Sequence, residues 1–341
     1  MRARGISYDT GFVRNGGSSR ENFEPEVVRR ELQIIRDDLH CTAVRVIGGD
    51  PERLELAATY AADLGLEVWF APYPLELTAD RMLGLIADCA ERAERIRQRG
   101  AEVVFVAGAE LSLMNPGFLP GDSVEERLDG LLGDRARMPE RIATLSAGVN
   151  DFLGQAVKVV RERFDGRITY AAIPLERVDW APFDIVGADL YRSAEVADQF
   201  ADGVCALVAQ GKPVAITEFG STCYRGAGDV GARAMEIGEY DKKTGALLRL
   251  NGQYARDEPG QARYLRELLE IFDAAGVDAA FVFLFALESF PHRPDGDPRD
   301  DLDMASPGIV KVLEGRGGET YPDLAWEPKA AFTAVADYYG R

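Results

Sequence analysis

The chain of 341 residues is 46% hydrophobic, which supplies enough apolar material for a sizeable core. It carries 39 Lys and Arg against 57 Asp and Glu, and its formal net charge of −18 would repel phosphate backbones and anionic lipid headgroups. Nucleic acid and membrane partners are therefore not expected.

The first residues, "MRARGISYDTG", lead directly into a strand-like segment and show no apolar secretion signal, and no run of 18 apolar residues follows. These features predict a cytoplasmic protein. Its 4 cysteines form no CxxC pair and are expected in the core. With only 2 histidines, an enzyme built on this chain would draw its acid and base from carboxylates, and neither a metal nor an organic cofactor is expected.

Short runs rich in Val, Ile, Phe and Tyr alternate along the chain with longer segments of helical period. This alternation predicts β/α units and a parallel sheet. Strands are expected at residues 5–8, 43–47, 67–71, 103–107, 169–173, 185–189, 214–217 and 280–285. The clearest amphipathic helices are expected at residues 25–39, 81–100, 141–164 and 260–276.

Glycines at positions 65, 100, 211 and 276 follow helical segments, where a left-handed residue closes a helix. About eight such units predict an α/β protein with one (β/α)₈ TIM barrel domain over residues 1–341. A doubly wound sheet is the alternative, but neither GxGxxG nor a phosphate loop is present. The long segments 111–139, 220–259 and 286–328 follow strands 4, 7 and 8, on the side where barrels place active sites.

Polar side chains gather at the carboxyl ends of the expected strands. In chain order they are Asp9, Arg45, Tyr73, Glu110, Glu176, Asp189, Tyr191, Glu218 and Glu288. Two of them end strands in the same way: "VVFVAGAEL" and "PVAITEFG" each run apolar up to one glutamate. Strands 4 and 7 stand on opposite sides of a barrel mouth, and two carboxyls about 5–5.5 Å apart suit double displacement at an anomeric carbon.

Glu110 and Glu218 are therefore the candidate catalytic residues. Arg45, Tyr191, Asp9, Tyr73 and Glu288 are the candidate substrate-binding residues. Each has a simpler interpretation: the glutamates as solvated strand ends, Arg45 as the neutraliser of buried acids, Tyr191 as a rim tyrosine. The acidic run from Asp295 to Asp303 lacks the spacing of a calcium loop and is expected to be solvated.

The sequence resembles the retaining glycoside hydrolases of clan A. The similar features are "VRV" on strand 2, a glutamate ending strand 4, "DLYR" on strand 6, "ITEFG" on strand 7 and the closing "WEPKAAFTAVADYY". The resemblance implies that Glu218 is the nucleophile and Glu110 the acid/base, with Arg45 and Tyr191 orienting Glu218. The segments "RDDLDMASPGIVKVL" and "YPDLAWEPKAAF" also resemble actinobacterial chains labelled abortive infection protein, a label that specifies no chemistry.

Two positions depart from the clan pattern. Where the clan usually has an asparagine before the strand-4 acid/base, this chain has Ala109, which cannot bond a sugar 2-hydroxyl. Where the clan commonly has a strand-8 tryptophan, "FVFLFALESF" offers only phenylalanines. An ordinary pyranoside is therefore a weaker expectation than the barrel and its carboxylate pair.

The expected function is a glycosidase of the retaining type, acting on a small glycoside or glycoconjugate within carbohydrate metabolism. One alternative is a biosynthetic lyase, cyclase or transglycosylase that uses the same carboxylates. Another is a non-catalytic barrel with a binding or phage-defence role. The sequence predicts neither the sugar, nor the anomeric configuration, nor an oligomeric state.

Overall fold

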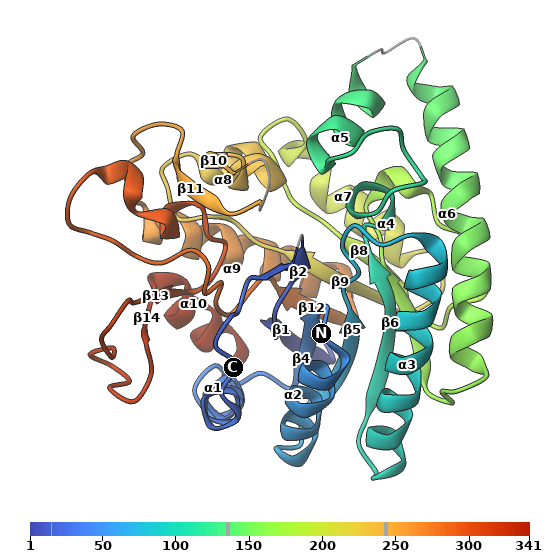
Figure 1. The fold of residues 1–341 in the computed structure, drawn as a ribbon, viewed down its shortest axis with the longest axis horizontal. Coiled ribbons are helices and arrows are strands. Elements are labelled where there is room, and N and C mark those ends of the chain that lie inside the picture. Colours follow the sequence, from blue (N-terminus) through green and yellow to red (C-terminus); the bar gives the residue numbers. More distant parts are fainter. Residues whose placement is uncertain (15, 134–136, 242–244) are drawn as a thin grey trace.

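Eight parallel strands form one sheet that curves into a barrel in the computed structural model, which describes residues 1–14, 16–133, 137–241 and 245–341 (Figure 1). In spatial order the strands are β7 (Arg167–Ala171), β6 (Val103–Ala109), β5 (Glu67–Pro72), β4 (Ala43–Gly48), β1 (Ala3–Asp9), β12 (Ala279–Val282), β9 (Val214–Phe219) and β8 (Val186–Asp189). The predicted (β/α)₈ barrel and all eight predicted strands are confirmed, so strands 4 and 7 of the sequence are β6 and β9.

The barrel closes between β7 and β8. The other neighbouring strands pair in parallel register, for example Ser7 of β1 with Arg45 of β4. The β7–β8 junction instead has an isolated parallel bridge between Ala172 and Ala188 and a few hydrogen bonds, such as that from the Thr169 hydroxyl to the Ile185 carbonyl at 3.0 Å. Trp69 lies inside the barrel, is fully buried, and packs on Phe281 with ring centroids 4.7 Å apart. Trp69 is therefore a packing residue.

Helices cover the outside of the barrel (Figure 1). They are α1 (Pro25–Asp37), α2 (Pro51–Asp63), α3 (Ala79–Gln98), α6 (Met138–Arg161), α7 (Ala197–Val208), α9 (Glu258–Ala275) and α10 (Ala330–Tyr339). Gly65, Gly100, Gly211 and Gly276 have φ of +80°, +97°, +90° and +81°, which confirms the predicted left-handed ends. No helix among the described residues is both long and apolar enough to cross a membrane.

One of the expected β/α units lacks its α-helix. The connection from β7 to β8, residues 172–185, contains only the 3₁₀ turn η1 (Pro174–Glu176) and irregular chain. The outer face of β8 is therefore covered by α7 and by this connection rather than by a helix of its own.

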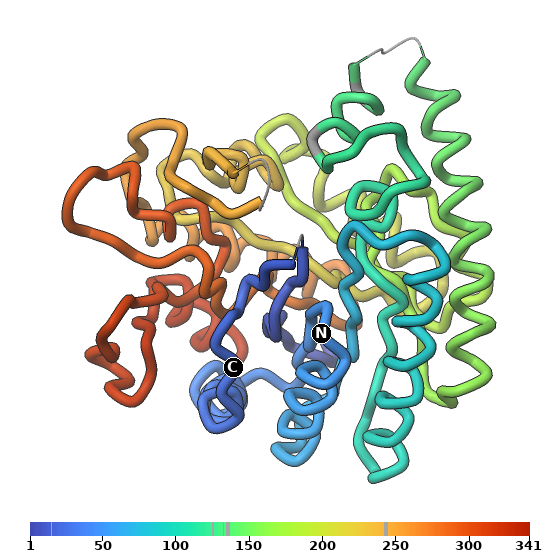
Figure 2. Tube along the Cα trace, in the orientation of Figure 1, coloured from blue at the N-terminus to red at the C-terminus, as the bar shows by residue number. Residues whose placement is uncertain are grey.

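The three long connections carry small elements beyond the carboxyl ends of β6, β9 and β12. The first holds α4 (Leu111–Met114) and α5 (Val124–Leu132); the second holds α8 (Ala227–Val230), η2 (Gly231–Met235), β10 (Gly238–Tyr240) and β11 (Leu247–Leu250). The third holds η3 (Pro298–Asp300), η4 (Leu302–Ala305), β13 (Val310–Val312) and β14 (Trp326–Pro328). A hairpin of β2 (Val13–Arg14) and β3 (Gly17–Ser18) follows β1. The second and third connections run side by side in the tube trace (Figure 2), and Arg299 donates to the Leu250 carbonyl across them at 2.8 Å.

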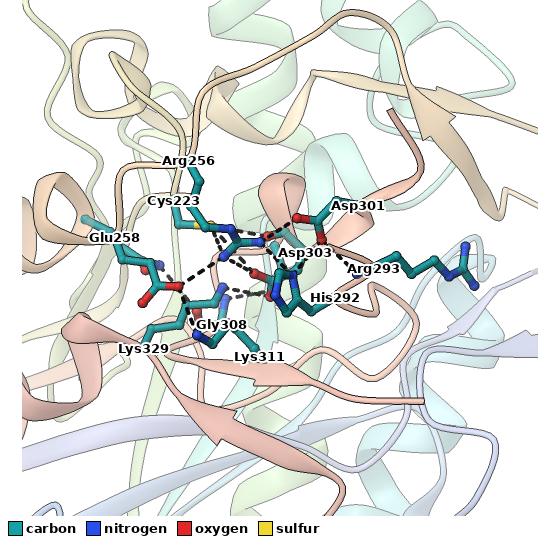
Figure 3. Close-up of polar contacts among 12 residues, drawn as sticks. Cys223, Arg256, Glu258, His292, Arg293, Asp301, Asp303, Gly308, Lys311 and Lys329 are labelled. Atoms are coloured by element: carbon teal, nitrogen blue, oxygen red, sulfur yellow. Dashed lines mark hydrogen bonds and ion pairs between the residues drawn. The ribbon is translucent and has the colours of Figure 1, made fainter. Parts of the chain in front are cut away.

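A buried ion cluster joins these two connections to the chain before α10 (Figure 3). Arg256 places Nη1 2.8 Å from Asp303 and Nη2 2.8 Å from Asp301, while Lys329 Nζ lies 2.8 Å from the other oxygen of Asp303. The expectation of a solvated acidic loop is therefore wrong for Asp301 and Asp303, because both carboxylates are buried against cations. Within the described parts of the chain, no group of three or more His, Cys, Asp or Glu side chains is placed to hold a metal ion.

Candidate active site

The two candidate catalytic glutamates stand at the carboxyl ends of β6 and β9. Glu218 is the second-last residue of β9, and Glu110 directly follows β6. Glu110 has φ 44° and ψ 40°, the left-handed region that residues with a side chain rarely adopt. This conformation, together with a register shift between Val106 and Ala109, turns the chain out of the strand into α4. Backbone strain of this kind is often found at functional sites.

The backbone after Glu110 is held by a second buried acid. The Leu111 N–H donates to the Tyr170 hydroxyl at 2.8 Å, and that hydroxyl donates to Glu176 at 2.9 Å. Glu176 also accepts from the Ser112 N–H at 3.0 Å. Burial raises the pKa of Glu176 to about 7 against these hydrogen bonds. Glu176 therefore positions the Glu110 turn.

Glu218 is fixed by two side chains, Tyr191 from the chain after the neighbouring strand β8 and Arg45 from β4 across the barrel. The Tyr191 hydroxyl donates to Oε1 at 2.6 Å, and Arg45 Nη1 lies 3.4 Å from Oε2 while it donates to the Thr217 carbonyl at 2.9 Å. Arg45 is fully buried and Glu218 is 4% exposed. Both oxygens of Glu218 thus have a set direction.

Burial, followed by the negative charge of Asp189, raises the pKa of Glu218 to about 7 against the opposing effects of Arg45 and the Tyr191 hydroxyl. Asp189 ends β8, is 3% exposed, and accepts a 2.6 Å hydrogen bond from the Thr217 hydroxyl. Its strand-end position was visible in the sequence, but nothing there distinguished it as a partner of the glutamate pair.

Glu110 differs from Glu218 in having no stabilising donor. Its carboxyl makes no hydrogen bond or ion pair with any residue that the structure describes, and the residue is only partly covered. Burial raises the pKa of Glu110 well above its ordinary value, and the charges of Glu218 and Asp189 add to the rise. Because Arg45 and Tyr191 favour ionised Glu218, Glu218 loses its proton before Glu110 does.

Tyr73 lies beside this pair. It is 5% exposed and packs edge-on against Phe12, with ring centroids 5.0 Å apart. Burial, followed by the charges of Glu218 and Glu110, raises the pKa of its hydroxyl well above the usual range. Of the seven predicted site residues, the structure thus brings five together: Glu110, Glu218, Arg45, Tyr191 and Tyr73.

Asp9 and Glu288 belong to a different network. Asp9 accepts from the Gly11 N–H at 2.7 Å and from the Ser19 hydroxyl at 2.6 Å, which holds the loop after β1. Glu288 forms an ion pair with Arg20 at 2.9 Å. Burial raises the pKa of Asp9 to about 6 and that of Glu288 to about 7. Direct contact of either residue with a substrate stays a prediction.

Apolar side chains form a core cluster inside the barrel. Ala109 is 1% exposed and Phe283 is 8% exposed, at the places where the sequence departs from the clan pattern. Partly buried apolar side chains pack around the barrel interior: Phe12, Leu75, Met114, Met235 and Leu287. Three cavities of about 480, 360 and 450 Å³ lie elsewhere, and neither Glu110 nor Glu218 lines any of them.

No protein-family model and no curated protein matches the sequence. Among solved structures, a GH113 β-1,4-mannanase is similar with a TM-score of 0.62 at 14% identity, over 99% of each chain. The GH113 β-mannanase of Alicyclobacillus acidocaldarius has a TM-score of 0.56 at 16% identity, over 99% of this chain and 97% of that one. A β-glucuronidase of an uncultured Clostridium has a TM-score of 0.56 at 13% identity, over 100% of this chain and 50% of that one. This chain therefore has the (β/α)₈ barrel fold of these glycoside hydrolases.

Proposed function

We propose that the protein is a retaining glycosidase that acts on a small glycoside or glycoconjugate, with Glu218 as nucleophile and Glu110 as acid/base. The observation that carries this proposal is that only one of the two strand-end carboxyls has a hydrogen-bond donor and a cation beside it. Glu218 has a 2.6 Å donor in Tyr191 and a cation in Arg45, whereas Glu110 has neither. One carboxyl is thus prepared to be an anion and the other to keep its proton.

In the first step a Glu218 oxygen forms a bond to the anomeric carbon while the bond between that carbon and the leaving oxygen breaks. The leaving oxygen takes the proton of Glu110. In the second step ionised Glu110 removes a proton from water, the hydroxide oxygen attacks the anomeric carbon, and Glu218 leaves as a carboxylate. Asp189 is not a reacting group in this scheme, but its charge near the pair favours the positive charge that develops on the sugar ring.

The names of the structural neighbours suggest which sugars to test first. Two are β-mannanases and one is a β-glucuronidase, so aryl β-mannosides and aryl β-glucuronides open the substrate panel. Ala109 offers no side-chain donor to a 2-hydroxyl, and therefore 2-deoxy and 2-amino sugars belong in the same panel.

Glu110→Gln is expected to separate substrates by leaving group. Dinitrophenolate leaves without a proton, so kcat/KM for a dinitrophenyl glycoside, which reports the first step, should fall less than about tenfold, whereas kcat/KM for an alkyl glycoside should fall by about 10²–10⁴-fold. The variant should also change the pH profile. Wild-type activity requires ionised Glu218 and therefore falls as the pH drops through about 7. It also requires protonated Glu110 and therefore falls at high pH. In Glu110→Gln only the fall at high pH should disappear.

The matched control is Glu195→Gln, an exposed glutamate that follows β8 outside the pair. It should leave both the leaving-group dependence and the pH profile unchanged. Equal losses of kcat/KM for the two leaving groups in Glu110→Gln would remove Glu110 from the acid/base role.

A second candidate function is a non-catalytic binding barrel. It is favoured by the low exposure of Glu218, 4%, and by the three cavities that lie away from the pair. The substrate panel distinguishes the two candidates, since a binding barrel would turn over none of the aryl glycosides, while glycan binding in calorimetry would persist in Glu218→Gln.

A further inference from the structure

A largely apolar cavity of about 480 Å³ lies outside the barrel, between β8 and α7. Small residues from the strands form its floor, namely Ala172, Gly187 and Ala188, and α7 contributes Val204 and Leu207. Its volume falls within the range of about 300–1,000 Å³ that is typical of small-molecule sites. The cavity shares no lining residue with the carboxylate pair.

The cavity exists because the β7–β8 connection has no α-helix to fill this part of the outer layer. The connection instead passes over the cavity and supplies Pro174, Arg177, Val178 and Trp180 to its wall. The small residues of the cavity floor are too short to fill the space. A larger residue cannot replace Gly187, because an added Cβ would lie 2.1 Å from the Tyr170 carbonyl oxygen of β7.

Arg177 gives this apolar cavity one positive charge. It has φ 47° and ψ 57°, a left-handed conformation unfavourable for a residue with a side chain, and its carbonyl accepts from Asn150 Nδ2 at 3.2 Å. The side chain is exposed, and no carboxylate lies within ion-pair distance of it in the described ranges.

We propose that this cavity binds a single-chain fatty acid, with the hydrocarbon chain between β8 and α7 and the carboxylate on Arg177. The apolar wall and the single cation are complementary to a ligand with an apolar chain and one anionic head. A sugar would place most of its hydroxyls against apolar walls, where Gln210 and Arg177 are the polar side chains among the lining residues, and an uncharged lipid would leave Arg177 without a counterion.

Trp180 provides the signal for a direct test, because it lines the cavity while Trp69 and Trp326 are buried elsewhere, at 0% and 3% exposure. Titration with a brominated dodecanoic acid is expected to quench tryptophan fluorescence saturably, and Trp180→Phe should abolish that quenching. Arg177→Gln should weaken binding by about tenfold or more, the effect of one lost charge-assisted hydrogen bond. Arg81→Gln, which removes another exposed arginine without an ion pair, should leave the Kd unchanged.

A second pair of variants tests the position of the chain. Gly203 of α7 lines the cavity, and a Cβ built there meets nothing within 4 Å, so Gly203→Leu should fold and block binding. Gly84→Leu in α3 is the matched control, since Gly84 also has open space and lies outside the cavity. Wild-type affinity in Gly203→Leu or in Arg177→Gln would overturn the proposal, as would equal affinity for brominated dodecanol and the acid.

Discussion

Glu218→Gln is expected to reduce kcat on every substrate of the protein by about 10⁴-fold or more, because the amide cannot attack an anomeric carbon. The loss should not depend on the leaving group, in contrast to Glu110→Gln. The variant keeps the size of the side chain and an oxygen that can accept from Tyr191, so KM should change little. Steady-state kinetics with dinitrophenyl and alkyl glycosides measure both effects.

Chemical rescue distinguishes a lost nucleophile from a damaged site. In Glu218→Ala, added azide should restore turnover of a dinitrophenyl glycoside and yield the glycosyl azide of inverted configuration, since azide takes the place of the carboxylate. Tyr191→Phe serves as the graded control: it removes one 2.6 Å donor but leaves the carboxylate, and a loss of about 10–10²-fold is expected. Glu218→Gln with more than a tenth of wild-type kcat would contradict the assignment.

Lys329→Met is expected to lower the free energy of unfolding by about 3–5 kcal/mol, because it leaves Asp303 in the protein interior without one of its two cations. The side chains of Lys329 and Asp303 are 0% and 1% exposed, with 2.8 Å between Nζ and Oδ1. Burial lowers the pKa of Lys329, but the charge of Asp303, the neighbouring Cys223 and the hydrogen bond to Asp303 together raise it above its ordinary value, so Lys329 remains charged at neutral pH. Urea denaturation measures the change directly.

The structure offers a matched lysine on the same cluster (Figure 3). Lys311 lies 3.2 Å from Glu258, but its side chain is 21% exposed, and Lys311→Met should cost at most about 1 kcal/mol. The double variant Lys329→Met with Asp303→Asn removes both charges of this pair and leaves neither unpaired. Its loss of unfolding free energy should therefore be smaller than the sum of the losses in the two single variants. A cost for Lys329→Met no larger than that for Lys311→Met would show that the buried pair contributes little.

The ion cluster also bears on the site, because it fixes two of the three long connections beyond the strand ends. Arg256 comes from the connection after β9, and Asp301 and Asp303 come from the connection after β12. The Cys223 thiol, five residues after Glu218, contacts Arg256 Nη1 at 3.5 Å. The cluster therefore anchors the chain that continues from the proposed nucleophile.

Sequence patterns were sufficient for the barrel because each strand is an apolar run, most strands are followed by an amphipathic helix, and several of these helices end at a glycine. They also located Glu110 and Glu218, since the carboxyl ends of parallel strands meet at one rim. The same rule selected Asp9 and Glu288, which the fold engages elsewhere: Arg20, from the loop after β3, pairs with Glu288 at 2.9 Å. No local sequence pattern identifies an ion-pair partner that comes from a distant loop.

The burial of charged side chains was the other feature that local sequence patterns did not predict. Asp301 and Asp303 read as a solvated acidic run, but their cations come from Arg256 and Lys329, which lie tens of residues away in the sequence. The sequence pattern also did not predict that the connection between β7 and β8 lacks an α-helix and has a 3₁₀ turn over Pro174–Glu176 in its place. The single-domain boundary and the C-terminal resemblance to chains labelled abortive infection protein stay predictions.

The most direct test of the central claim is to trap the covalent intermediate. A panel of 2-fluoroglycosides with dinitrophenolate leaving groups, and the matching cyclitol epoxides, is incubated with the protein, and the labelled peptide is identified by mass spectrometry. The account predicts one label per chain, on Glu218, with loss of activity and with no label in Glu218→Gln. A protein that turns over the parent glycoside yet carries the label on another residue, or carries none, would contradict it.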